Sequence, residues 1–321
     1  MRQIRFIIFL AMCCVLAVGA KAQQGQRYAQ YMFNTFAYNP AYAGVPGMTQ
    51  IGLLYRSNWT GYDPSFGDNA NLNTKLFTLN SPILRANSGA GLTVVSDVIG
   101  PLVYLHGNVA YAYHLGIGEN KLSFGIQAGF VNQSRDNSAT RVVDETDPLL
   151  GVSENQTRPD MAVGMYFQGQ RIYAGVSYSH LLKSEFNFGS DDFTNPLESE
   201  VTFTGGYNFT YNYDFVITPS FFVLTDFKDY TFDVSTVVTY KKQIWGGLSY
   251  RDSDAMSLLL GYGFLKDKSL RFGYAFDYVF SNQEAKSPTS HEFSLNYTLP
   301  LSGKANKKII QTPRYKHSEN Y

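Results

Sequence analysis

The stretch VYLHGNVAYAYHL, residues 103–115, alternates between bulky apolar side chains and small or polar ones. Large apolar residues occupy positions 103, 105, 109, 111, 113 and 115, and the positions between them carry mainly histidine, glycine, asparagine and alanine. Because successive side chains of an extended strand point to opposite faces, this pattern predicts a strand with one apolar face and one small or polar face.

The same alternation recurs to the end of the chain, for example in residues 122–130, 201–211, 230–240 and 270–280. It predicts about 14 strands, an even number, as a single-chain bacterial barrel requires. The expected strands lie near residues 49–59, 70–79, 89–96, 102–115, 120–132, 160–168, 170–181, 200–211, 214–224, 229–240, 242–251, 255–264, 269–280 and 291–300.

Two architectures accommodate such strands. A soluble β-sandwich would bury the apolar face between two sheets, whereas an outer-membrane barrel would turn it toward lipid. Many of the segments have the length of about ten residues with which a tilted strand crosses the apolar layer, and Tyr and Phe gather toward strand ends as in an aromatic girdle. We therefore predict an all-β, transmembrane outer-membrane β-barrel of about 14 antiparallel strands. The soluble sandwich remains the alternative.

Residues 1–22 have the layout of a secretory signal peptide. Two arginines precede an apolar run at residues 7–18, and small residues flank Lys21. This order predicts cleavage after Ala22 and a destination in the bacterial outer membrane. A single transmembrane anchor is an alternative, although the run is shorter than the roughly 20 residues that a span needs; a lipoprotein signal at Cys13 is another. No apolar run near 18 residues follows, which excludes later transmembrane helices.

Removal of this segment changes the chemistry that the chain can perform. Taking 22 residues from 321 leaves 299, and both cysteines are lost with them, so disulfides and cysteine-based sites are excluded. The loss of Arg2, Arg5 and Lys21 leaves 23 basic residues against 26 acidic ones. This balance gives no support for nucleic-acid binding, and a secreted destination argues against it.

A second stretch, QYMFNTFAYNPAYAG at residues 30–44, contains five aromatic residues and no charged one. Its QYMFN and NPAYAG elements resemble the N-terminal signature of the PorP/SprF family of outer-membrane proteins, which belongs to the type IX secretion and gliding motility systems of Bacteroidetes. Further segments follow in the family's order, including YRSNWTGYD at 55–63, with Asn58 where glutamine is usual, GAGLTVVSDVIGP at 89–101 and SHEFSLNY at 290–297. The 20 residues after Leu301 depart from the pattern.

The resemblance implies a non-enzymatic barrel that delivers, binds or anchors secreted proteins or adhesins at the cell surface. It implies as partners outer-membrane lipid, cargo with a C-terminal targeting domain and other type IX secretion components, among them a periplasmic peptidoglycan-associated protein. A passive channel for small solutes is the alternative function. The chain is accordingly expected to divide into a signal peptide (1–22), an N-terminal plug or periplasmic segment (23–48), the barrel (49–301) and a basic periplasmic tail (302–321).

Three groups of residues are candidate sites. The uncharged aromatic segment needs a surface to cover it, so we expect it either to plug or brace the periplasmic mouth or to bind a partner. Its residues are Tyr31, Met32, Phe33, Asn34, Asn39, Pro40, Tyr42 and Gly44. Inward-facing charges are expected to form a network in the lumen, or else to line a pore or contact a ligand. They are Arg56, Asp233, Arg271, Asp277 and Glu292. Arg271 and Glu292 are expected to meet if the register allows. The tail is a docking segment or a solvated end, through Lys304, Lys307, Lys308, Arg314 and Lys316.

Other chemistry lacks a pattern. The five histidines show no metal-binding spacing, and no catalytic constellation can be singled out, so we expect no enzyme, no metal and no cofactor. The acidic stretch at residues 144–148 lacks the spacing of a calcium loop and is expected to be solvated.

Overall fold

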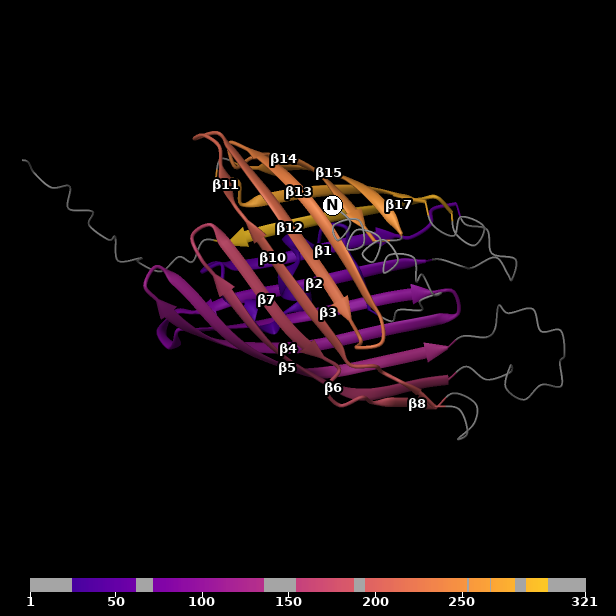
Figure 1. The fold of residues 1–321 in the computed structure, drawn as a ribbon. Helices are drawn as coiled ribbons and strands as arrows, with labels where there is room; N and C mark the ends of the chain where they lie inside the picture. The colour runs from indigo at the N-terminus through magenta and orange to yellow at the C-terminus, as the bar shows by residue number, and fades with distance from the viewer. Residues whose placement is uncertain are drawn as a thin grey trace, which may run out of the picture.

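The computed structural model describes residues 25–61, 72–135, 154–187, 194–252, 254–265, 267–280 and 287–299. Fourteen antiparallel strands form a closed β-barrel, as the alternation predicts (Figure 1). No helix in the described part of the chain is long and apolar enough to cross a membrane.

The barrel strands follow one another around the wall in chain order. They are β1 (Thr49–Ser57), β2 (Asn73–Ile83), β3 (Ser88–Ile99), β4 (Leu102–Ile117), β5 (Asn120–Arg135), β6 (Glu154–Gln168), β7 (Ile172–Ser179), β10 (Glu200–Tyr207), β12 (Phe215–Thr225), β13 (Tyr230–Tyr240), β14 (Ile244–Arg251), β15 (Ala255–Phe264), β16 (Leu270–Val279) and β17 (Thr289–Leu299). A two-residue strand, β11 (Phe209–Thr210), continues β10, and a separate hairpin joins β8 (Glu185–Asn187) to β9 (Thr194–Pro196).

Two pairings complete the ring. The first strand pairs with the last, with Arg56 of β1 opposite Glu292 of β17. In the middle of the chain β10 pairs with β12, with Val201 opposite Thr225. Every described barrel strand thus pairs with two neighbours, so none of them forms an edge of the sheet along its whole length.

The two faces of the wall differ as the alternation predicts. In β15, the outward residues Met256, Leu258 and Leu260 are exposed, whereas Ser257 and Leu259 between them are buried. The outward residues present the apolar face that an outer-membrane barrel turns to lipid. The inward face is mostly small or polar and meets the contents of the lumen.

The two ends of the barrel differ in their connections. The four longest intervals of sequence between barrel strands, residues 58–72, 136–153, 180–199 and 280–288, separate strand ends that lie at the loop end. At the turn end the intervals are shorter, such as 118–119 and 169–171, and there β1 begins and β17 ends. Outer-membrane barrels place long loops outside the cell and short turns in the periplasm. The loop end is therefore the expected outer face.

The expected strand at residues 160–168 begins six residues too late. β6 starts at Glu154 and pairs with β5 as far as Arg135, so both strands extend into the interval between the expected strands at residues 120–132 and 160–168. The additional outward positions include Asn155 and Thr157, which are polar. Without an apolar residue at alternate positions, the sequence pattern could not reveal this part of the strand.

Candidate functional site: the occupied lumen

Residues 25–45, here called the lumen segment, lie inside the barrel. The segment contains three short helical turns, η1 (Tyr31–Phe33), α2 (Thr35–Tyr38) and η2 (Pro40–Tyr42). Most of its residues are buried although it is not part of the sheet, because its side chains contact inward-facing residues on opposite sides of the wall. Burial of each large side chain contributes about 1.5 to 3 kcal/mol.

Asn39 fixes the lumen segment near the turn end. Its side-chain oxygen accepts a hydrogen bond from the backbone N–H of Ala41 at 2.9 Å and so caps η2, where proline can occupy the first position. Its amide nitrogen donates to the backbone carbonyls of Met165 in β6 at 3.0 Å and Val176 in β7 at 3.2 Å. One side chain therefore both starts the helical turn and ties it to two strands.

Two wall glycines allow η2 to approach closely. A Cβ atom at Gly125 in β5 would collide with the backbone of Pro40 and Ala41, and one at Gly164 in β6 would collide with the side chain of Asn39. Gly44, near the end of the segment, has a backbone φ of +74°, a conformation that favours glycine. Its N–H donates a hydrogen bond to the side chain of Asn80 in β2. The small residues of the wall and of the segment are therefore complementary in shape.

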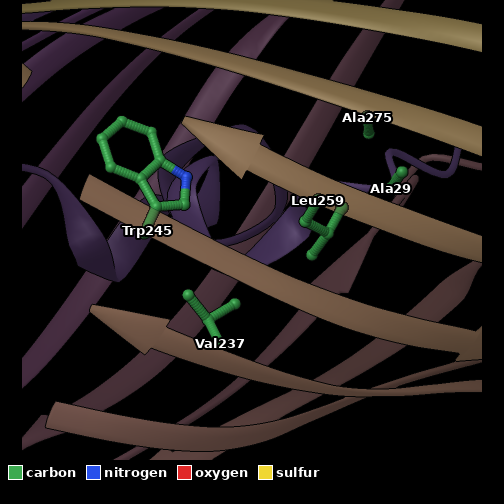
Figure 2. Close-up of a cluster of buried hydrophobic side chains, with 5 residues drawn as sticks. All are labelled: Ala29, Val237, Trp245, Leu259 and Ala275. Carbon is green, nitrogen blue, oxygen red and sulfur yellow. The ribbon is translucent and has the colours of Figure 1, made fainter. Parts of the chain in front are cut away.

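The aromatic residues of the segment contact two further parts of the wall. The Tyr31 hydroxyl lies 2.7 Å from Ser235 Oγ in β13 and 3.2 Å from Ser220 Oγ in β12. Phe33 packs on Trp245 with ring centroids 5.5 Å apart. Figure 2 shows Trp245 within the buried cluster of Val237, Leu259, Ala275 and Ala29, of which only Ala29 comes from the lumen segment.

The remaining candidates of the segment also lie against the wall or within the segment itself. Met32 packs against the cluster of Figure 2, and Asn34 donates from its side chain to the carbonyl of Gln30 at 2.9 Å. Tyr42 meets the ring of Tyr166 edge-on at 5.0 Å. Burial raises the pKa of Tyr42 to about 12, so this phenol stays neutral at physiological pH.

A charged network lies in the lumen near the loop end. Arg56 binds Asp277 at 2.6 Å and Glu292 at 3.0 Å, and Arg251 lies 3.2 Å from Asp233 and 3.6 Å from Asp277. The five residues come from five strands, β1, β13, β14, β16 and β17, whose charges thus form one chain of contacts. Buried ions require such pairing, because each loses its hydration.

The network also binds the lumen segment. Glu292, which is fully buried, accepts hydrogen bonds from the backbone N–H groups of Ala29 at 2.8 Å and Gln30 at 2.9 Å. Arg27 lies 3.8 Å from both Asp233 and Asp254. The same carboxylates therefore stabilise the wall and hold the start of the segment.

Arg271 is the exception among the five charges expected in the network. The register sets Arg271 opposite Asn296, whereas Glu292 lies opposite Ala275, so Arg271 and Glu292 do not meet. The Arg271 guanidinium lies over the Trp245 ring, 5.1 Å from its centroid. The partners that the sequence analysis missed are Arg27, Arg251 and Asp254; of these, Arg251 shares the inward positions of β14 with Trp245 and Ser249, so the alternation could have revealed it.

The lumen segment reaches further than the turn-end mouth that the sequence analysis considered. Tyr42 and Gly44 lie near the turn end, but Ala29 and Gln30 bind Glu292 in the loop-end part of β17. The segment therefore occupies most of the length of the lumen.

Several expectations fall outside the described residues. These are the signal peptide, the acidic stretch at 144–148 and the basic tail with its five candidate residues. Among the described residues, no group of three or more His, Cys, Asp or Glu side chains is placed to hold a metal ion. His106 lies 6.3 Å from His180 between ring centroids, and His180 binds Asp160 at 3.1 Å.

The closed wall, its apolar outer face and its filled interior define an outer-membrane β-barrel with an occupied lumen. The family model described as type IX secretion system membrane protein PorP/SprF matches residues 20–297, and the chain belongs to that family. No match to a curated protein was found.

Three solved structures to which the chain is similar share little of its sequence. The chain is 14% identical to a Pseudomonas aeruginosa FadL homologue, covering 82% of this chain and 93% of that one with a TM-score of 0.46. The chain is 12% identical to the CymD monoaromatic hydrocarbon channel, and the match covers 88% of this chain and 94% of that one with a TM-score of 0.48. It is 9% identical to the Acinetobacter baumannii outer-membrane protein Omp33, and the match covers 78% of this chain and 98% of that one with a TM-score of 0.46.

Proposed function

We propose that this protein is a non-enzymatic outer-membrane component of the type IX secretion system that delivers, binds or anchors secreted proteins or adhesins at the cell surface. Its membership of the PorP/SprF family, over residues 20–297, is the observation that carries this proposal. The cargo, which carries a C-terminal targeting domain, meets the loop end. Other secretion components, including a peptidoglycan-associated protein, meet the turn end in the periplasm.

The lumen segment supports a binding role over a passive channel. Its contacts reach opposite sides of the wall, through Glu292 in β17, Ser235 in β13 and Met165 in β6. We expect a segment held in this way to act as a plug that obstructs the passage of solutes.

Lysines at the turn end are candidate contacts for a periplasmic partner. Lys241 and Lys242 are exposed in the connection between β13 and β14, and Lys268 lies in the next connection at this end. Since β17 ends here, we expect the tail to add Lys304, Lys307, Lys308, Arg314 and Lys316. An acidic partner would gain from both sets of charges, and its binding would weaken with salt.

Two measurements test the proposal. Deletion of the gene should remove cargo from the cell surface, and the wild-type gene should restore it, whereas the variant with Tyr31, Phe33 and Tyr42 changed to serine should not. Normal surface cargo in the deletion strain would contradict the proposal. In a planar bilayer the purified protein should pass no steady current; a steady open-pore current would favour the channel for small solutes.

A further inference from the structure

A cavity of about 270 Å³ remains in the lumen beside the start of the lumen segment. It lies between Tyr28 and Tyr38 of the segment and the wall formed by β3 to β7 and β10, and the β8–β9 hairpin contributes Phe186 to its lining. At about 30 Å³ for each water molecule, it has room for about nine. The cavity is therefore large enough for a short piece of chain.

The lining of the cavity is acidic. It contains the carboxylates of Asp97, Asp160 and Glu200, and none of the described residues that line it is Lys or Arg. Asp97 accepts a hydrogen bond from the Thr74 hydroxyl at 2.5 Å, and Asp160 binds His180. Glu200 forms no such bond with the described part of the chain.

A second observation indicates a ligand-binding role for this cavity. Thr93 lines the cavity and is only 3% exposed, yet its hydroxyl has no hydrogen-bond partner among the described residues. Buried polar groups are nearly always paired, and a buried carboxylate needs a cation or hydrogen-bond donors. The lining therefore suits a positively charged group that can donate several hydrogen bonds.

The chain itself enters this cavity. Gly25 and Gln26 belong to its lining, and a Cβ atom added to Gly25 would lie 2.8 Å from Oε1 and 2.9 Å from Oε2 of Glu200. Cleavage after Ala22 would place only Gln23 and Gln24 ahead of Gly25. Two residues span at most about 7 Å, so a chain cleaved there would begin within reach of Glu200.

We propose that this cavity is the binding site for the α-ammonium group of Gln23, created when the signal peptide is removed, and that Glu200 is its ion-pair partner. The proposal rests on the predicted cleavage site but not on any role in secretion. An α-ammonium group supplies both the positive charge and three N–H donors. The uncleaved chain carries Ala22 and the apolar signal sequence at this point, which an acidic cavity does not accommodate. Seating of the lumen segment is therefore coupled to signal-peptide removal.

The test uses full-length protein processed in the cell and purified folded in detergent. Mass spectrometry of the N-terminal peptide should find the chain starting at Gln23 with a free amine. An amine-acetylating reagent is then applied near neutral pH, where α-amines react ahead of lysine because their pKa is lower. We expect the α-amine of the folded protein to react at least tenfold more slowly than that of the denatured protein.

Variants test whether protection of the α-amine depends on the carboxylate of Glu200. E200Q should raise the acetylation rate of the folded protein several-fold, and E200D should restore much of the protection. E198Q is the matched control, since Glu198 lies two residues away and pairs with exposed Lys228 at 2.6 Å, and it should leave the rate unchanged.

Three results would overturn the proposal. They are a chain that starts elsewhere, a cyclised N-terminal glutamine without a free amine, and equal acetylation rates in folded and denatured wild-type protein. The last comparison needs no variant, so it stands even if E200Q does not fold. Cargo display is scored separately, because its loss or retention leaves these outcomes unaffected.

Discussion

Replacement of Glu292 by glutamine tests what holds the lumen segment in place. The carboxylate accepts the N–H groups of Ala29 and Gln30 through separate oxygens and also binds Arg56 at 3.0 Å. A carboxamide offers one oxygen, so its NH2 group would face an N–H group of the segment. Arg56 would keep Asp277 as its remaining partner.

The expected effect is large because the site is fully buried. Loss of one partner from a buried ion pair costs about 3 to 5 kcal/mol. At about 1.4 kcal/mol for each factor of ten, the population with the segment released should rise by about one hundred to several thousand fold. The substitution also weakens the contact between Glu292 and Arg56 within the wall and so destabilises the barrel itself. Release of the segment and stability of the barrel must therefore be measured separately.

The rate of trypsin cleavage after Arg27 measures release of the lumen segment from the barrel interior. The E292Q protein, folded in detergent, should be cut at Arg27 much faster than wild type, because proteolysis of a rapidly opening segment follows the open population. Resistance of the barrel to SDS at room temperature shows that the wall remains folded. Transient current in a planar bilayer should appear only in the variant.

E198Q removes a carboxylate of the same kind from a pair with an exposed lysine and should change neither measurement. If E292Q is cut at Arg27 at the wild-type rate and passes no current while the barrel is folded, Glu292 does not anchor the segment. The reasoning from the buried network would then be refuted.

Three further outcomes follow from the same contacts. Y31F removes the hydroxyl that contacts Ser235 and Ser220 and should lower the free energy of unfolding in denaturant titration by about 1 kcal/mol, whereas Y213F, at a fully exposed tyrosine, should not change it. G125A should displace η2 and speed cleavage at Arg27, whereas G116A, whose Cβ would meet nothing within 4 Å, should leave cleavage unchanged; equal rates would contradict the close fit. Deletion of residues 303–321 should weaken co-purification of periplasmic partners at low salt, and unchanged recovery would exclude docking through the tail.

The sequence by itself determined the barrel and the direction of its side chains. Alternation is a local property, because each residue of a strand faces the side opposite to its neighbour. It predicted that Arg56, Asp233, Asp277 and Glu292 face inward, and the structure brings these four into one network. It failed where polar residues fill both faces, as at the start of β6.

Only the tertiary structure decided which inward residues meet. The height of a side chain in the lumen depends on the stagger between strands around the closed wall, and no single strand contains that information. For this reason Arg251 joins the network whereas Arg271 lies over Trp245. The path of residues 25–45 depends likewise on glycines, carboxylates and hydroxyls contributed by strands distant in the sequence, so its aromatic composition predicted that it needs a surface but could not identify that surface as the interior of the barrel.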